Sequence, residues 1–353
     1  MNSRALLPDT ANLPESTPQP VDPNATDLTA HRIHAMPVVV IAMHEGCECR
    51  CVMCDIWKIR EPREMAISNL EQQMESFETL GVRWVVLTGG EPQRHSHFVD
   101  FAHAVRSRGI RVTVLTAGLD LVKDAKQVAH SVDDLIVSLD GPAAIHDQIR
   151  RVPGAFEKLT AGIRAVRSVR PEIAIRARCT VQSANHLWLC RTVESAKEIG
   201  LDSISFLAAD VTSPAFNRPL AWAPSRQNTV TLDDAQVRAL EQEIERLITQ
   251  HGGGSFVVEN AEKLRRIVLH FRAHLGQTRA VAPRCNAPWV SAVIEVGGDV
   301  RPCFFHAAVG NIRQQTLAEI VNSPGALQFR SKLDMAANPT CRRCVCSLYV
   351  PPA

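Results

Sequence analysis

The chain has 353 residues, of which 45% are hydrophobic and 22% are charged, with 39 basic and 37 acidic side chains. This composition indicates a globular chain of about two domains, and the near-balance of charge disfavours a broad nucleic-acid surface. The longest apolar run, residues 38–43, is far shorter than the ~20 residues that cross a bilayer, so the sequence predicts no membrane span.

Residues 1–35 are predicted to form a disordered tail, which could alternatively cap a partner's surface. Prolines interrupt any helix in this segment, and polar residues fill the gaps between them. No apolar stretch of the length of a secretory signal follows Met1. A cytoplasmic protein with reduced thiols is therefore expected.

From residue 37 the chain alternates between short β-branched runs and amphipathic segments. The expected strands are residues 38–43, 84–88, 112–116, 135–139, 173–181 and 203–207. The expected helices are residues 68–80, 96–108, 121–130, 155–169 and 187–200. Repeated strand-then-helix steps predict a parallel sheet covered by helices, which either a barrel-like or an open doubly wound sheet would satisfy.

A further helix is expected over residues 232–250, and the glycines at 252–254 mark a boundary or hinge after it. The remainder, residues 255–353, has little regular periodicity and holds five of the eleven cysteines. We expect a small domain there, built around a metal centre. Reduced cysteines in such numbers point to metal or redox chemistry.

Three cysteines with the spacing C-x3-C-x2-C follow the first expected strand. They are Cys47, Cys51 and Cys54, in a loop at the edge of the sheet where such folds place their active sites. Three thiolates hold three irons of a [4Fe–4S] cluster and leave the fourth iron open for chemistry. Zinc or a purely structural cluster is the alternative. Cys49 is surplus to the pattern, as a bystander or as a substitute ligand.

This motif resembles that of the radical S-adenosylmethionine (radical SAM) enzymes. The resemblance implies that the open iron chelates S-adenosylmethionine (AdoMet) and that Met53 lies against its adenine. Residues 88–92 match the family's GGEP motif, in which Gly89, Gly90 and Glu91 contact the AdoMet amino group. Glycines allow a close backbone approach, and a carboxylate pairs with an ammonium.

The fourth and fifth strands extend the resemblance. Ser138 and Asp140 belong to a segment similar to the family's SLDG motif, and strand alternation turns them toward the barrel interior. An inward Arg178 is expected to meet the AdoMet carboxylate, with a salt bridge to a neighbouring strand as the alternative. Asn185 and Leu207 lie where the family contacts AdoMet. His95, His97 and His103 are interpreted as solvated side chains.

The C-terminal cysteines resemble the SPASM/twitch extension of radical SAM enzymes. Cys285, Cys303, Cys341 and Cys344 would hold one auxiliary [4Fe–4S] cluster, although a four-cysteine zinc site has the same C-x2-C spacing. Cys346 departs from the pattern, as a spare thiol, an alternate ligand or a hydrogen donor. Cys346 and Tyr349 are the candidates for a catalytic role.

The sequence therefore predicts an α/β chain in which residues 36–250 form a partial (β/α)6 TIM-like barrel and residues 251–353 an auxiliary-cluster domain. The resemblance implies AdoMet, two [4Fe–4S] clusters and a flavodoxin- or ferredoxin-type electron donor. The expected reaction is hydrogen abstraction from a small sugar-like or alcohol substrate, with the auxiliary cluster assisting its oxidation. Peptide modification, sugar or amino-acid epimerisation, and a non-enzymatic iron–sulfur or zinc redox sensor remain alternatives.

Overall fold

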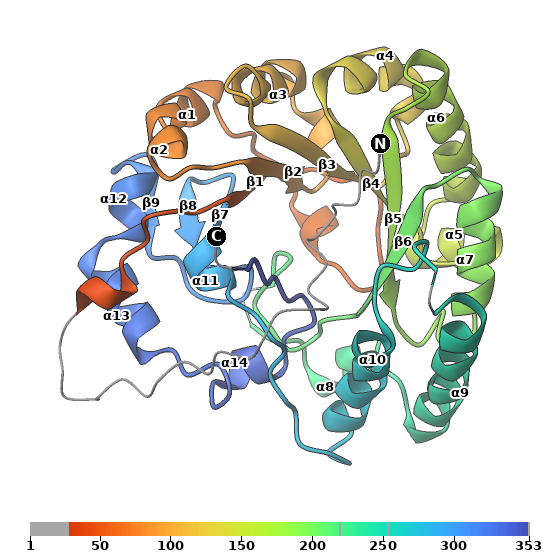
Figure 1. Cartoon of the computed structure of the whole chain (residues 1–353). Helices are drawn as coiled ribbons and strands as arrows, with labels where there is room; N and C mark the ends of the chain where they lie inside the picture. The colour runs from red at the N-terminus through yellow and green to blue at the C-terminus, as the bar shows by residue number, and fades with distance from the viewer. Residues whose placement is uncertain (1–27, 219, 253, 352–353) are drawn as a thin grey trace.

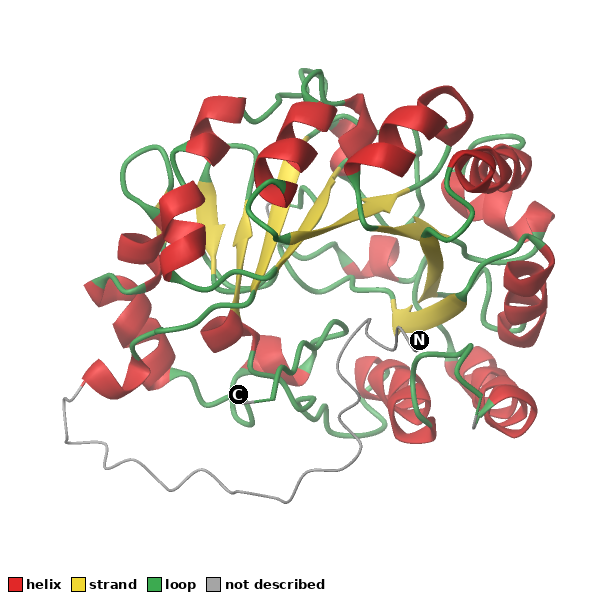
Figure 2. Ribbon diagram, turned by 45° about the horizontal axis from the view of Figure 1, so that its top comes forward, coloured by secondary structure: helices red, strands yellow, loops and turns green. Residues whose placement is uncertain are grey.

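The computed structural model describes residues 28–218, 220–252 and 254–351, and six of its strands pair in parallel in the order in which they occur in the chain. The strands are β1 (Val38–His44), β2 (Trp84–Gly89), β3 (Arg111–Thr116), β4 (Asp134–Ser138), β5 (Ala174–Val181) and β6 (Ser203–Ala208). They form a curved sheet with helices on its outer face (Figure 1; Figure 2). The expected partial (β/α)6 barrel is confirmed.

The helices of this half follow the strands in the chain. They are α1 (Ile67–Glu71), α2 (Met74–Thr79), α3 (Phe98–Arg106), α4 (Leu121–Ser131), α5 (Ala143–Arg150), α6 (Ala155–Val169), α7 (Leu189–Glu198), α8 (Pro224–Gln227) and α9 (Asp234–His251), with short 3-10 turns η2 (Ile56–Lys58) and η3 (Pro92–Arg94). On β1, Val39, Ile41 and Met43 are buried in the core beneath these helices. Strand alternation leaves the intervening residues facing the barrel interior.

The expected helix over residues 68–80 is divided into α1 and α2. The division lies at Gln73, whose side chain donates to the Ile312 carbonyl at 3.2 Å and accepts from the Leu317 N–H at 2.7 Å. A helical periodicity carries no information about partners so distant in the chain, so the division between α1 and α2 was not predicted. It joins the barrel to the C-terminal part of the chain.

The C-terminal part is more regular than expected and continues the barrel sheet. Strand β7 (Ser291–Ile294) pairs in parallel with β1, and β8 (Asp299–Arg301) and β9 (Gly310–Asn311) follow in antiparallel order. The helices here are α10 (Ala261–His274), α11 (Ala287–Val290), α12 (Leu317–Val321), α13 (Pro324–Lys332) and α14 (Pro339–Arg342). One sheet thus crosses the boundary expected at residues 250–251.

The expected tail falls largely outside the described residues, which begin at residue 28. Within them, η1 (Leu28–His31) forms a 3-10 turn, and Ile33 is buried. The backbone of Ile33 exchanges two hydrogen bonds with the Asn322 side chain, and Arg330 Nε donates to the His31 carbonyl. Residues 28–36 are therefore packed against the C-terminal part rather than forming part of a free tail.

Polar side chains fill the end of the barrel at which the strands begin. Asp134 pairs with Arg111 at 2.6 Å, approaches Arg176 at 3.5 Å and accepts from Thr113 at 2.9 Å. This buried network occupies the N-terminal end of the barrel and leaves the opposite end for the site. No helix in the described ranges is both long enough and apolar enough to cross a membrane.

Candidate functional site

The four thiols after β1 are gathered in one loop at the C-terminal end of the strands. Cys49 and Cys51 are buried, whereas Cys47 and Cys54 are partly exposed. Hydrogen bonds that the Cys49 thiol donates to Cys47 and Cys51, together with burial, raise the pKa of Cys49. Burial raises the pKa of Cys54 to about 12, with Cys51 and Cys47 contributing as neighbouring charges. The predicted ligands Cys47, Cys51 and Cys54 are therefore close together.

Two segments hold this cysteine loop. The end of α5 accepts from it on both sides of Cys51, through Arg50 N to Arg150 O at 3.0 Å and Val52 N to Ile149 O at 3.2 Å. The segment after β6 binds the residue that follows Cys54.

That residue is Asp55, whose carboxylate accepts from Trp222 Nε1 at 2.6 Å and whose backbone N–H donates to the Phe216 carbonyl. Arg226 adds a hydrogen bond to the Val52 carbonyl at 2.7 Å. The loop therefore has fixed partners on both sides.

The glycines of the GGEP segment allow the backbone before Cys47 to pass close to the end of β2. A Cβ atom on Gly89 would lie 2.3 Å from the His44 carbonyl oxygen, and one on Gly90 would lie 2.2 Å from that of Gly46. Gly89 also has a φ of +132°, which favours glycine. In this structure the close neighbour of both glycines is the backbone that leads into Cys47. Their predicted contact with AdoMet stays a prediction.

Glu91 carries an unpaired carboxylate oxygen inside the protein. Its Oε2 accepts from the Ala117 N–H at 2.8 Å, while the buried Oε1 has no hydrogen-bond partner. Burial raises the pKa of Glu91 to about 7. Gln93 lies close by, bonded to Thr116 at 3.0 Å, and its buried Nε2 is also unpaired. Unpaired buried polar atoms are rare, so these atoms suit a polar ligand.

Gln93, two residues after Glu91, was not identified as a site residue from the sequence. The signal that identifies it is an amide side chain that immediately follows the glycine-rich strand end. Its unpaired amide can donate, whereas Glu91 accepts. The two side chains together can bind an ammonium and a neighbouring acceptor.

Asp140 and Asn185 have partners within the protein. The Asp140 carboxylate pairs with Arg150 at 2.5 Å and accepts from the Thr180 N–H at 2.9 Å. The Asn185 amide donates to the carbonyls of Asp140 and Thr180. Both are fully buried, so they hold β4 and β5 together at the site. Ser138, the last residue of β4, is partly exposed.

Arg178 is a cation at the C-terminal end of β5. It is partly exposed, and its Nε lies 3.5 Å from Ser205 Oγ. Among the described residues, no carboxylate lies within ion-pair distance of it; the salt bridge considered for this position is made instead by Arg176. Glu259 was not identified from the sequence; its carboxylate accepts from the Phe206 N–H at 2.9 Å.

Burial raises the pKa of Glu259 to about 7, while the charge of Arg178 acts in the opposite direction. The two side chains are thus near each other beside β6.

The two apolar residues predicted to contact AdoMet lie elsewhere in this region. Leu207 of β6 is partly exposed. Met53 packs against the apolar group formed by Ala209, Val211, Trp222 and Val230. Because no carboxylate lies within ion-pair distance of Arg178 among the described residues, its guanidinium remains available to a ligand carboxylate.

The four predicted auxiliary ligands are also gathered. Burial raises the pKa of Cys303 and of Cys341 to about 11, and Cys285 contributes to both as a neighbouring charge. Burial also raises the pKa of Cys344, and Cys285 and Cys303 add to this effect. The segment near 285, the loop after β8 and α14 thus bring four thiols together.

Two backbone or ring groups contact these thiols. The Ala287 N–H donates to Cys285 Sγ at 3.5 Å, and His306 Nε2 lies 3.4 Å from Cys341 Sγ. His306 is a buried residue that the sequence reading missed. Hydrogen bonds to ligating sulfurs are typical of iron–sulfur sites.

The auxiliary thiols do not form a preformed site for a single metal ion. In the part of the chain that the structure describes, no three Cys, His, Asp or Glu side chains converge on one metal position.

The two catalytic candidates are placed differently. Burial raises the pKa of the Cys346 thiol, the charge of Arg178 from the barrel opposes that effect and the charge of Cys285 adds to it, so Cys346 is near both residues. Tyr349 instead contacts Arg284, whose guanidinium lies 3.9 Å from the centre of the ring and donates to the hydroxyl at 2.7 Å. Only Cys346 lies toward the barrel.

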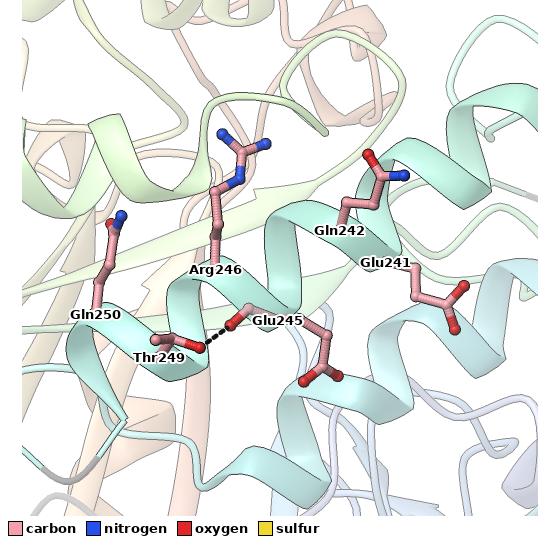
Figure 3. A pocket seen from close by; sticks show the side chains of 6 residues that line it. All are labelled: Glu241, Gln242, Glu245, Arg246, Thr249 and Gln250. Carbon is pink, nitrogen blue, oxygen red and sulfur yellow. Dashed lines mark hydrogen bonds between the residues drawn. The ribbon is translucent and has the colours of Figure 1, made fainter.

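A hollow on the surface of α9 is a separate feature. Figure 3 shows its lining, which is Glu241, Gln242, Glu245, Arg246, Thr249 and Gln250. Glu241 and Glu245 are paired with Arg272 and Arg265 of α10. This hollow contains none of the predicted site residues, so the candidate site is the one at the cysteine loop.

Comparison with protein families matches two parts of the chain. Residues 41–180 match the model of the radical SAM superfamily, and residues 285–345 match SPASM, an iron–sulfur cluster-binding domain. The first match contains Cys47, Cys51, Cys54, Glu91 and Arg178. The second contains the auxiliary thiols apart from Cys346.

Individual proteins resemble the chain over most of its length. It is 27% identical to the AdoMet-dependent heme synthase of Methanosarcina barkeri over 293 residues, which are 78% of this chain and 79% of the relative. It is 25% identical to the Fe-coproporphyrin III synthase of the same organism, over 87% of this chain and 80% of the relative.

The fold is shared with SuiB of Streptococcus suis, for which structures are known with the precursor peptide SuiA and with S-adenosylmethionine. The TM-score is 0.64 and the identity 17%, over 91% of this chain and 74% of SuiB in the peptide complex. At this identity the likeness is one of fold.

Proposed function

The chain belongs to the radical SAM superfamily and carries a SPASM iron–sulfur domain, and we propose that it abstracts a hydrogen atom from a tetrapyrrole substrate. As an enzyme of this class it binds AdoMet with one [4Fe–4S] cluster and holds auxiliary iron–sulfur chemistry in the SPASM domain. The residue roles and the substrate that follow are our proposal.

The observation that carries the proposal is the grouping of three kinds of ligand at the same end of the barrel. Cys47, Cys51 and Cys54 hold the cluster, the unpaired Oε1 of Glu91 accepts from the AdoMet ammonium, and Arg178 donates to its carboxylate. When bound, the cluster supplies the electron that converts AdoMet into a hydrogen-abstracting radical.

The protein's contribution is to position these groups and to exclude water from them. The Glu91 carboxylate is fixed by the Ala117 N–H before any ligand arrives, so it does not need to reorganise on binding. Asp140 and Asn185 support the strand ends from behind. The auxiliary thiols Cys285, Cys303, Cys341 and Cys344 form the second metal centre.

The tetrapyrrole class is supported by the two relatives named above, each of which matches over most of its own length. Their names, a heme synthase and an Fe-coproporphyrin III synthase, both denote enzymes of iron tetrapyrroles. No relative named above acts, by its name, on a sugar or an alcohol. The sequence-based preference for such a substrate therefore gains no support, and we do not extend it.

A peptide substrate is the second candidate. It is favoured by the shared fold with SuiB, which has been seen with its precursor peptide and which matches 91% of this chain, including the C-terminal part. For both candidates we place the auxiliary centre near the barrel, which is supported by a Cys346 thiol near enough to Arg178 and to Cys285 to be affected by both charges.

The test is made with anaerobic, reconstituted protein, AdoMet and a reductant. We expect iron coproporphyrin III to be consumed with release of 5′-deoxyadenosine in proportion to product. Turnover of a precursor peptide without turnover of the porphyrin would replace the first candidate by the second. Substituting a flavodoxin or ferredoxin for the chemical reductant then tests the proposed type of electron donor.

The two-centre arrangement is tested by iron content. Reconstituted protein should hold about eight irons, and a Cys47/Cys51/Cys54 triple alanine variant should retain about four. Zinc in the remaining site of an active enzyme would remove the electron-accepting role of the second centre, because zinc has no redox step. A triple variant that holds no iron would contradict two independent centres.

A further inference from the structure

Arg150 is a buried cation in contact with one of the cysteine thiols. It is the last residue of α5, and its Nη1 lies 3.5 Å from Cys51 Sγ. Its Nη2 lies 2.5 Å from the carboxylate of Asp140, which is 0% exposed. Asp140, Arg150 and Cys51 thus form a buried line of anion, cation and thiol, with the cation in the middle.

The Asp140 end of this line is fixed from several directions. Its Oδ1 accepts from the Thr180 N–H, its own N–H donates to His146 Nδ1 at 3.2 Å, and its carbonyl accepts from Asn185. Removal of the Arg150 charge would therefore leave Asp140 in place with no other cation within ion-pair distance among the described residues.

The Cys51 end is fixed by the same helix that carries the cation. The carbonyls of Ile149 and Arg150 accept from the backbone on either side of Cys51, as described above. The guanidinium and the sulfur are thus held in register by backbone hydrogen bonds that do not involve the Arg150 side chain. A substitution in that side chain can change the charge beside the sulfur while the loop keeps its anchors.

We propose that Arg150 acts through Cys51 to raise the reduction potential of the AdoMet-binding cluster, and that Asp140 opposes it as the counter-charge. This rests on the proposed role of Cys51 as a cluster ligand. Reduction adds one negative charge to the cluster, which a neighbouring cation and a hydrogen bond to sulfur stabilise and a neighbouring carboxylate destabilises. Both charges are buried, so solvent screens them little.

The proposal predicts shifts of opposite sign for two adjacent residues. Arg150→Met should disfavour one-electron reduction by about tenfold, a potential about 59 mV lower, and Asp140→Asn should shift the potential upward. Arg226→Met is the matched control, because Arg226 donates to the Val52 carbonyl of the same loop and contacts none of its thiols in the described structure. The control should keep the wild-type potential.

The measurement is a potentiometric titration of the reconstituted full chain, followed by the electron paramagnetic resonance signal that changes on addition of AdoMet. That signal reports the cluster with the open iron and separates it from the auxiliary centre. Iron content and thermal unfolding of each variant are measured alongside. A merely structural role for Arg150 would lower iron content or stability and leave the potential of the loaded fraction unchanged.

Equal potentials, or shifts of the same sign in Arg150→Met and Asp140→Asn, would overturn the proposal. If Arg150→Met does not load, Arg150→Lys keeps the charge with less hydrogen bonding and should give a smaller downward shift. Cys51→Ala tests the premise separately. Retention of the AdoMet-sensitive signal in Cys51→Ala would refute Cys51 as a ligand. Loss of the signal in Cys51→Ala, together with a wild-type potential in Arg150→Met, would refute only the tuning role of Arg150.

Discussion

Replacing Glu91 with glutamine keeps the size of the side chain and removes its charge. The carboxylate is fixed by one hydrogen bond from Ala117, and its other oxygen is buried without a partner. In the proposed complex the AdoMet ammonium satisfies that oxygen. Glutamine retains an acceptor for Ala117 and loses the ionic partner, so the variant isolates the charge.

The substitution should have opposite effects on the stability of the ligand-free protein and on AdoMet affinity. Burial raises the pKa of Glu91 from 4.5 to about 7, and this difference corresponds to about 3 kcal/mol between the two protonation states. The ionised form is therefore the costly one in the ligand-free fold. Glu91→Gln should stabilise the ligand-free protein above pH 7 by up to about 3 kcal/mol. Loss of one partner of a buried pair costs ~3–5 kcal/mol, so AdoMet affinity should fall by about two to four orders of magnitude.

The sign of the pH dependence follows from the raised pKa. A carboxyl with a raised pKa in the folded state binds protons more tightly there, so its effect on stability is absent below pH 4.5 and becomes fully unfavourable above about pH 7. AdoMet binding needs the ionised form. Its affinity in the wild type should therefore fall as the pH drops below about 7, and the fall should be absent in Glu91→Gln.

The assay is calorimetric titration of AdoMet into reconstituted protein at several pH values, with denaturant unfolding of the ligand-free protein beside it. Glu64→Gln is the control, since the Glu64 carboxylate, which lies near His44, is itself partly exposed. An AdoMet affinity within threefold of wild type in Glu91→Gln, at unchanged iron content, would refute the assigned role.

Four further substitutions test the cysteine loop. Cys49→Ala should keep iron content and 5′-deoxyadenosine release, whereas Cys51→Ala should abolish release; an inactive, folded Cys49→Ala protein would reassign the ligands. Gly90→Ala should lower the iron loaded per chain, because its Cβ would lie 2.2 Å from the Gly46 carbonyl oxygen, and normal loading would contradict that reading. Trp222→Phe removes a donor to a buried carboxylate and should lower the free energy of unfolding by ~1–3 kcal/mol, with a change below 0.5 kcal/mol counting against it.

The barrel half of the fold was predictable because its signals are local. The expected helix over residues 155–169 coincides with α6 (Ala155–Val169), and the expected strands agree with β1–β6 to within a residue or two. The C-terminal part was predicted poorly for a physical reason. Strands of two to four residues, such as β9 (Gly310–Asn311), carry no measurable alternation, and their pairing partner lies far away in the chain.

The missed helix α10 is a different case, since Leu264, Ile267, Val268 and Phe271 recur at helical spacing and are buried. The pattern was present in the sequence, and the expectation of little regular periodicity after residue 255 is wrong for this segment. The division at Gln73 was not available, because it depends on carbonyl and N–H groups more than two hundred residues away.

For the site, strand alternation predicted at which strand ends the candidate groups lie, but it did not assign their partners. Asp140 was expected to reach AdoMet, and the structure gives its carboxylate to Arg150 and Thr180. Strand alternation predicts which way a side chain points, and not which of several inward groups meets it first. That the Oε1 atom of Glu91 has no hydrogen-bond donor depends on the positions of all the surrounding groups, which the sequence does not give.

The pairing of β7 with β1 makes the strand that leads into the cysteine loop an interior strand. Both of its edges are occupied, by β2 on one side and by β7 on the other. A chain cut at the glycines after α9 would lack β7 and leave one edge of β1 with unpaired backbone donors and acceptors. Exposed edges of this kind recruit strands from other molecules. The auxiliary domain therefore also acts as a cover against self-association, and a barrel expressed alone should precipitate whether or not its own cluster is loaded.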